Sequence, residues 1–399
     1  MNNSLTYRYS HHQTIEFILI FILLIFPKID LISIPKYYQG IRIEDLAVAY
    51  IGISLYFSNS LEIQKKDFGY FFYVYFALML ITMIHGALYF NQKWIIVGRY
   101  LEYIIVLIYF NRNNPSIKSI FLILRTYLLL NLIFVILQQN GLVGEFSSLG
   151  YEDPAAGEMS DSRPTGLTGG PWELSNCAAI IFFTLLLDKK QSNFSKYTYS
   201  FIAIFLILAT YSRTIFVSFA LAAVLYFIVL NITKKKFYFF ILLLGVLVLF
   251  IIFYFKNIYS GYGDVYLELI PMFKNFIFYQ QVVHRPELGI IDGRLWSMAY
   301  RLEHWLQYYN QFLLNPFTIV FGTGSTTLYY DSFLFRILFT TGIFGLFFVI
   351  YIIKNIPLHI LFLFLVSGLT LDLLLSFKIF FTMLLYFYIE NKLKYDYRN

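Results

Sequence analysis

The sequence is poor in charged residues and in cysteine, and both shortages narrow the classes of protein that it can encode. Of its 399 residues, 13% are charged and 59% are hydrophobic, whereas about a quarter of the residues in soluble domains are charged. We therefore expect lipid to be the solvent for most of the chain. The one cysteine, Cys177, excludes an internal disulfide framework and a thiolate cluster for zinc or iron–sulfur binding.

Patterns that bind metals and nucleotides are also missing from the sequence. The six histidines show no HExxH or other close metal-binding spacing, and neither a Walker loop nor a GxGxxG motif occurs. We expect no metal and no other cofactor. The net charge of +7 is compatible with nucleic-acid binding, but the positive residues cluster at the ends of apolar segments, where they determine membrane orientation. We expect no nucleic-acid partner.

Long apolar segments are what the sequence has in abundance. A helix needs about 20 mainly apolar residues to cross the ~30 Å hydrocarbon layer of a membrane. We expect about twelve spans, at residues 14–33, 44–58, 67–88, 93–110, 117–138, 171–187, 197–211, 213–233, 236–255, 331–353, 356–375 and 377–391. The pattern predicts an all-α, polytopic transmembrane helical bundle that forms one integral membrane domain over residues 1–399.

The distribution of positive residues predicts how this bundle is oriented. With a cytoplasmic amino terminus, the inner loops and tails carry fifteen Lys and Arg residues, and the short outer connections carry six. This bias predicts that both termini are cytoplasmic. Two long connections, residues 139–170 and 256–330, then form large outer loops. We expect the chemistry there, because long loops in compact proteins are usually functional.

The first outer loop ends in a glycine-rich segment directly before an expected span. The segment reads Gly166-Leu-Thr-Gly169-Gly170-Pro171-Trp-Glu173, and backbone amides at a glycine-rich helix start can bind an anion. Gly169, Gly170 and Glu173 are therefore candidate substrate-binding residues. The alternative interpretation is a turn followed by an ordinary helix start.

The second outer loop contains a predicted amphipathic helix over residues 293–313. Its polar side carries Arg294, Ser297, Arg301, His304, Trp305 and Tyr308. Guanidinium groups bind phosphate in a bidentate manner, and flat aromatic rings offer stacking area for a sugar. We predict that this side points outward and that Arg301, His304 and Trp305 bind substrate. The alternative is a polar helix face that meets only water or lipid headgroups.

Several ionisable residues lie at or inside the limits of the expected spans. Arg99 and Glu102 are three residues apart on one helix, so we expect them to neutralise each other. Arg213 has no acidic residue within one helical turn. Because a charge at membrane depth is costly, Arg213 is the better candidate for a ligand contact.

Four landmarks in the sequence follow one another in a recognisable order. They are Arg163-Pro-Thr-Gly166 with Gly170-Pro171; Ser212-Arg213-Thr214; Gly293-Arg294 with Trp296; and Asn315-Pro316, Gly322-Thr-Gly324, Asp331-Ser-Phe-Leu334 and Gly342-Ile-Phe-Gly345. In this order and topology the chain resembles the O-antigen polymerase and ligase families, over residues 139–350.

The resemblance implies a metal-independent glycosyltransferase of the bacterial inner membrane whose donor is a glycan on undecaprenyl diphosphate. It implies that Arg213 and Arg294 hold the donor diphosphate and that Arg163 and Arg301 contribute further contacts. Ligases of the group carry a histidine where this chain has Asp331, which favours a polymerase. Asp331 is a candidate base for the acceptor hydroxyl, and a helix cap is its alternative role.

The preferred function is therefore polymerisation of lipid-linked repeat units into O-antigen or capsular polysaccharide. The expected partners are the lipid-linked oligosaccharide, as both donor and acceptor, and the bilayer, while a chain-length regulator stays open as a further partner. The alternatives are an O-antigen ligase and a flippase for lipid-linked oligosaccharides. A flippase is disfavoured because the sequence shows no internal repeat.

Overall fold

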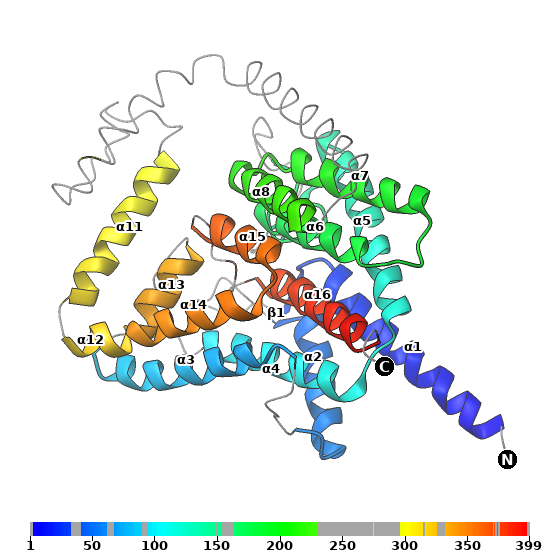
Figure 1. Cartoon of the computed structure of the whole chain (residues 1–399), viewed down its shortest axis with the longest axis horizontal. Coiled ribbons are helices and arrows are strands. Elements are labelled where there is room, and N and C mark those ends of the chain that lie inside the picture. Colours follow the sequence, from blue (N-terminus) through cyan, green and yellow to red (C-terminus); the bar gives the residue numbers. More distant parts are fainter. Residues whose placement is uncertain are drawn as a thin grey trace. The chain divides into compact units, whose positions relative to one another are not determined.

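The structure is a computed structural model, and in the residues that it describes the chain is mostly helical (Figure 1). The described residues are 3–32, 41–61, 68–89, 95–147, 150–152, 163–229, 274, 296–313, 316–324, 332–369, 371, 373 and 376–396. These ranges contain fourteen helices and two small two-stranded sheets. The helical content agrees with the expected all-α class. The expected span at residues 236–255 lies outside the described residues.

The elements group into two compact units. The first unit comprises Met1–Ala77, Trp94–Phe219 and Leu373–Asn399, and the second comprises Leu78–Lys93 and Ala220–Asp372. The first contains α1 (Asn3–Ile25), β1 (Asp30–Ile32), β2 (Ile41–Arg42), α2 (Ile43–Phe57), α4 (Ile95–Asn113), α5 (Ile117–Gln139), β3 (Glu145–Ser147), β4 (Gly150–Glu152), α6 (Pro171–Leu186), α7 (Asn193–Ala209) and α16 (Phe377–Asp396). The second contains α11 (Trp296–Leu313), α12 (Pro316–Phe321), α13 (Phe333–Thr341), α14 (Ile343–Asn355) and α15 (Leu358–Gly368). Two helices, α3 (Tyr70–Tyr89) and α8 (Arg213–Val229), run from the first unit into the second.

Helix α6 forms the core of the first unit. Every residue from Glu173 to Leu185 is buried, and the helix packs against α7 and α16 (Figure 1). A helix that is buried on all sides belongs to the middle of a bundle. Aromatic rings add to the packing around α16, where Tyr103 and Phe380 stack with ring centroids 4.1 Å apart.

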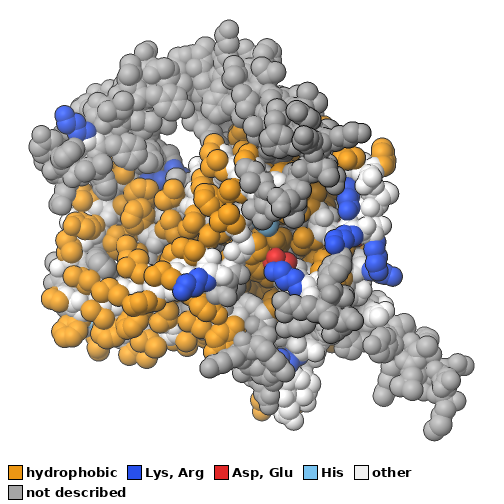
Figure 2. Space-filling model, in the orientation of Figure 1, with side chains coloured by type: hydrophobic (Ala, Val, Ile, Leu, Met, Phe, Trp, Pro, Cys, Tyr) orange, Lys and Arg blue, Asp and Glu red, His pale blue; other side chains and the backbone are white. Residues whose placement is uncertain are grey.

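The surface of the described residues is strongly apolar, as expected for a membrane protein. The side chains of Phe57, Leu88 and Phe194 are 79%, 76% and 82% exposed, and Figure 2 shows hydrophobic side chains over much of the visible face. Soluble monomers rarely expose such large apolar areas. By length and composition, α5 is the one helix in the described part of the chain that is apolar and long enough to cross a membrane. The expected twelve spans are not confirmed.

The end of the first expected span differs from the prediction. Helix α1 ends at Ile25, and residues 30–32 instead form the strand β1, which pairs antiparallel with β2. Pro27 accounts for the early end, because proline cannot continue a helix and restricts the residue before it. Residues 26–32 of the expected span are therefore not helical, and the chain there leads toward α2.

The tenth expected span, residues 331–353, is wrong as a single helix. The chain breaks at Gly342, whose φ of +59° is left-handed, and forms the two helices α13 and α14. A Cβ atom at Gly342 would lie 2.6 Å from the carbonyl oxygen of Ile319 and 2.7 Å from the amide nitrogen of Gly322. Only glycine fits such a close backbone approach at this φ. The expected span at 356–375 is also shorter, because α15 ends at Gly368.

Candidate functional site

The glycine-rich segment before α6 folds tightly onto α5. The side-chain oxygen Oε1 of Gln138 accepts hydrogen bonds from the amides of Thr165, at 3.1 Å, and Gly166, at 2.8 Å. Oδ1 of Asn131 accepts one from the amide of Leu167, at 2.9 Å. Gly166 has a φ of +58° and no room for a Cβ atom beside Asn131. Two buried amide side chains of α5 thus hold this turn in place.

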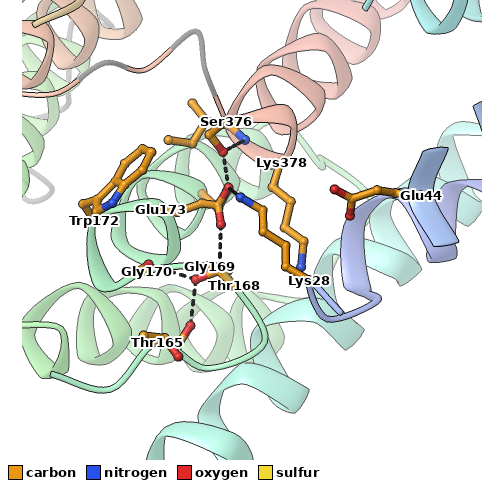
Figure 3. Close-up of polar contacts among 12 residues, drawn as sticks. Lys28, Glu44, Thr165, Thr168, Gly169, Gly170, Trp172, Glu173, Ser376 and Lys378 are labelled. Carbon is orange, nitrogen blue, oxygen red and sulfur yellow. Dashed lines mark hydrogen bonds and ion pairs between the residues drawn. The ribbon is translucent and has the colours of Figure 1, made fainter. Parts of the chain in front are cut away.

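Glu173, in the first helical turn of α6, stabilises the same glycine-rich segment. Its carboxylate is fully buried; Oε2 accepts a hydrogen bond from the amide of Gly169, at 2.7 Å. Oε1 is 2.7 Å from Nζ of Lys28 and also accepts a hydrogen bond from the hydroxyl of Ser376. Glu173 therefore joins the turn, the segment after α1 and the start of α16 (Figure 3).

A second lysine completes this group of charges. Lys378 is fully buried, and its Nζ donates to the carbonyl oxygen of Leu167 at 2.6 Å. Glu44 at the start of α2 is 2% exposed, neither of its oxygens accepts a hydrogen bond among the described residues, and Figure 3 shows its carboxylate pointing toward the lysine side chains. We call Lys28, Glu44, Glu173, Ser376 and Lys378 the polar centre. The side chain of Arg42 is also buried, and its Nη1 lies 3.7 Å from Oε1 of Glu44. Buried charges of opposite sign thus lie together, as the burial of charge requires.

A neighbouring ion pair confirms one expectation and extends it. Nη1 of Arg99 lies 2.6 Å from Oε2 of Glu102, as the spacing on one helix predicted, and 3.1 Å from Oδ1 of Asp45. The other oxygen of Asp45 accepts a hydrogen bond from the amide of Arg42, at 2.9 Å. Arg99 therefore links α4 to the start of α2, which is a structural role.

The predicted residues Gly169, Gly170 and Glu173 lie together, but their polar groups are largely occupied within the protein. The amides of residues 165–167 and 169 donate to Gln138, Asn131 and Glu173, and the amide of Thr168 donates to the carbonyl oxygen of Thr165 at 3.1 Å. In this arrangement these amides stabilise the turn and do not point into an anion site. Substrate binding by these residues stays a prediction.

Two of the predicted arginines lie at the same end of the first unit as the polar centre. Arg163 is exposed and directly precedes the turn. Helices α6 and α7 pack against each other and are joined by a short connection, so α7 ends beside the beginning of α6. Three residues separate that end from Arg213, the first residue of α8. Tyr211 just before it has a φ of +52°, a conformation that non-glycine residues seldom adopt and that often marks functional turns.

The other two predicted catalytic residues, Arg294 and Asp331, lie outside the described residues. The neighbouring helix start is described, and Ser332 is the N-cap of α13. Its hydroxyl oxygen accepts a hydrogen bond from the amide of Phe335, at 3.3 Å, and donates to the carbonyl oxygen of Gly368, at 2.9 Å. Ser332 thus fills the N-cap position of α13, and the roles of Asp331 stay predictions.

The predicted helix in the second outer loop is confirmed as α11, beginning at Trp296, but its orientation differs from the prediction. The indole of Trp305 packs on Phe335 of α13, with ring centroids 4.6 Å apart, and Nε of Arg301 is buried. Leu302 is 1% exposed, while Tyr309 and Leu313 on the expected inner side are 41% and 49% exposed. Arg301, His304 and Trp305 are half-buried, so the side that carries them is partly covered by α13 instead of pointing freely outward, and substrate binding by these residues stays a prediction.

Residues that sequence reasoning missed are Lys28, Glu44, Ser376 and Lys378. Lys28 and Lys378 were counted only as markers of membrane orientation. Both lie at the edge of an apolar segment, and a charge in that position usually has a partner or a function. That signal identified Arg213 and could have identified the two lysines.

Comparison with known proteins gives one match. The family model described as O-antigen ligase matches residues 198–350, which is less than half of the chain and runs from α7 to α14. Three of the four sequence landmarks fall inside this range. No curated protein and no solved structure matches the chain. The match supports placement in the O-antigen ligase and polymerase superfamily, membrane-associated glycosyltransferase-like enzymes of polysaccharide biosynthesis, and it does not distinguish polymerase from ligase.

Proposed function

We propose that the protein polymerises oligosaccharide repeat units carried on undecaprenyl diphosphate, at the periplasmic face of the bacterial inner membrane. The observation that carries the proposal is the match of residues 198–350 to the O-antigen ligase family. This range includes Arg213, α11 with Arg301 and the glycine-dependent turns around Gly342. Asp331 at the position where ligases carry a histidine favours the polymerase within this group.

The proposed reaction moves one glycan chain onto the end of another. A hydroxyl oxygen of the acceptor glycan bonds to the anomeric carbon of the donor sugar, and the bond between that carbon and the diphosphate oxygen breaks. The electron pair leaves with undecaprenyl diphosphate, and the hydroxyl proton passes to a base, for which Asp331 is the candidate. Diphosphate is already a competent leaving group, so the enzyme mainly needs to orient the substrates and to neutralise charge.

Arginine suits this role because it stays cationic and offers a fork of donors to phosphate oxygens. Arg213 and Arg294 are the proposed diphosphate contacts, with Arg163 and Arg301 as further contacts. The common location of Arg163 and Arg213 at one end of the first unit supports the first part of this assignment. Trp305 and His304 on α11 are proposed sugar contacts.

An O-antigen ligase is the second candidate, because the matching family model carries that description. The two functions differ in the acceptor. A polymerase extends a glycan that is still on its lipid carrier, whereas a ligase transfers the finished chain to lipid A-core or to another acceptor.

Deletion of the gene, followed by gel analysis of surface and lipid-linked glycans, separates the two. Loss of a polymerase leaves single repeat units on the acceptor, because the ligase of the cell still works. Loss of a ligase leaves the acceptor bare and polymer accumulating on undecaprenyl diphosphate. Complementation with the wild-type chain should restore the ladder. The second pattern would exclude the polymerase and favour the ligase.

A further inference from the structure

The first unit contains a large cavity at the end opposite to the polar centre. Its volume is about 1300 Å³. The lining comes from the last turns of α4 and α16, from the first turns of α5 and from the connection between α6 and α7, and Gln13 of α1 and Phe68 complete it. Helix α5 has 23 residues and is therefore about 34 Å long. Its first turns line this cavity, and its last turn holds the glycine-rich turn.

Positive charge predominates in the cavity wall. Five lining side chains are cationic and one is acidic: Lys118, Arg125, Lys189, Lys190 and Lys392 against Asp188. Arg125 and Asp188 form an ion pair, with Nη2 and Oδ2 2.5 Å apart. The other four cationic side chains of the wall are lysines. Figure 2 shows Lys and Arg side chains gathered at the side where Figure 1 draws the turn between α6 and α7.

The beginning of α5 adds a second attraction for an anion. Ser116 is the N-cap residue, but it makes no side-chain hydrogen bond to the first turn. Ser116, Ile117 and Lys118 all line the cavity. The amide groups of a first helical turn carry a partial positive charge and favour phosphate or carboxylate groups. The lysine side chains and the start of α5 thus both favour an anion in the cavity.

Apolar side chains line the same cavity beside these polar groups. Phe110, Ile117, Phe121 and Leu187 contribute to the wall. Nearby on α7, the side chains of Phe194 and Tyr197 are 82% and 64% exposed. Exposed aromatic rings are typical of the interface between headgroups and hydrocarbon. A single phosphate ion would fill only a small part of a volume that exceeds most small-molecule pockets, so the wall suits an amphiphile with a phosphate group.

We infer that this cavity binds a phosphate-bearing ligand, whose phosphate lies against the lysines and the start of α5. An anionic phospholipid could contact both the charged and the apolar side chains of the wall, with its phosphate at the lysines. A soluble phosphate-bearing molecule would contact the charged side chains alone. The site lies at the end of the first unit that the positive charges predict to be cytoplasmic. It is independent of the proposed polymerase activity at the other end.

The test uses the full-length protein purified in a neutral detergent, with thermal unfolding measured against added ligand. The probes are phosphatidylglycerol, phosphatidylcholine and inorganic phosphate. The cavity variant is Lys189→Gln with Lys190→Gln, and both lysines are exposed. The control variant is Lys196→Gln with Lys354→Gln, two cations predicted for the same membrane side that are not among the described residues lining the cavity.

Phosphatidylglycerol should stabilise the wild type and the control, and the cavity variant should need about thirty-fold more lipid for the same shift, because each lysine near a lipid surface contributes about 1 kcal/mol. Stabilisation by inorganic phosphate alone, lost in the cavity variant, would support the phosphate site and assign it to a soluble ligand. Equal weakening of both variants, or equal stabilisation by phosphatidylcholine, would overturn the inference. Absence of any shift with phosphatidylglycerol and phosphate would overturn it as well.

Discussion

Replacement of Glu173 by glutamine tests whether the polar centre is a closed electrostatic network. The carboxylate of Glu173 is 0% exposed and Lys28 is 11% exposed, with 2.7 Å between Oε1 and Nζ. Glutamine keeps the size of the side chain and one carbonyl oxygen, but it removes the negative charge. Of the two carboxylates in the polar centre, only that of Glu44 would then remain for Lys28 and the buried Lys378, and Glu44 is already paired with Arg42 at 3.7 Å.

The expected cost follows from burial. Removal of one partner of a buried ion pair costs about 3–5 kcal/mol, because the other charge stays buried without compensation. The glutamine oxygen still accepts one of the present hydrogen bonds, from Lys28 or from the amide of Gly169, so we expect a loss near the lower limit, about 3 kcal/mol. That is a large part of the 5–15 kcal/mol by which proteins are typically stable.

The assay is reversible unfolding of the purified protein in mixed micelles. An exposed ion pair in the same protein serves as the control. Nζ of Lys394 lies 2.9 Å from Oε1 of Glu390, and Lys394 is 63% exposed. Glu390→Gln breaks this exposed pair and should cost less than about 1 kcal/mol. The double variant Lys28→Gln with Glu173→Gln should be less destabilised than the sum of its single variants.

Equal costs for Glu173→Gln and Glu390→Gln would refute the reasoning, and so would strictly additive costs in the double variant. Polysaccharide gels on the same variants separate stability from function. If Glu173→Gln kept wild-type stability but lost long chains, the carboxylate would have the substrate-binding role that the sequence predicted.

Three further predictions concern the proposed site and the second unit. Arg213→Ala should abolish long polysaccharide chains on a gel while membrane insertion persists, and Arg213→Lys should restore them only in part, because lysine keeps the charge but not the bidentate fork. Asp331→Asn should leave thermal stability unchanged, because Ser332 caps α13, and should shorten chains if Asp331 is the base. Gly342→Ala should lower stability by more than about 1 kcal/mol, because alanine disfavours the left-handed φ and its Cβ would meet backbone atoms of residues 319–322; unchanged unfolding would contradict the helix break.

The helices that could be predicted are those bounded by local signals. The limits of α2, α5 and α6 agree with the expected segments to within about two residues. Proline or charged residues next to these apolar segments provided the limits. The helical period also located α11 inside a long loop, and the three-residue spacing of Arg99 and Glu102 predicted their ion pair.

The break at Gly342 could not be predicted from its own segment. Residues 331–353 are mainly apolar, and the spacing of apolar residues in such a segment does not indicate a break. The need for glycine arises from the backbone of residues 319–322, which packs against the break from about twenty positions earlier. The helical period likewise separated the two sides of α11, but it could not predict that Trp305 packs on Phe335 of α13.

The polar centre depends on pairing across large sequence distances. Lys28 and Glu173 are 145 positions apart, and Glu173 and Ser376 are 203 positions apart. No local spacing relates these residues, so composition and motifs could only place each of them near the end of a span. Their pairing is determined by the packing of α6 against α16.

Positive residues that were counted for membrane orientation lie in two places in the first unit, the polar centre at one end of α5 and the cavity at the other. Lys28 and Lys378, which the sequence assigned to the outer side, lie in the polar centre with the acids Glu44 and Glu173. Four of the lysines assigned to the inner side line the cavity: Lys118, Lys189, Lys190 and Lys392. The two sets lie at opposite ends of one unit, with the apolar helix α5 between them. The end of this unit that carries the cavity is therefore the end that the positive-inside rule predicts to face the cytoplasm.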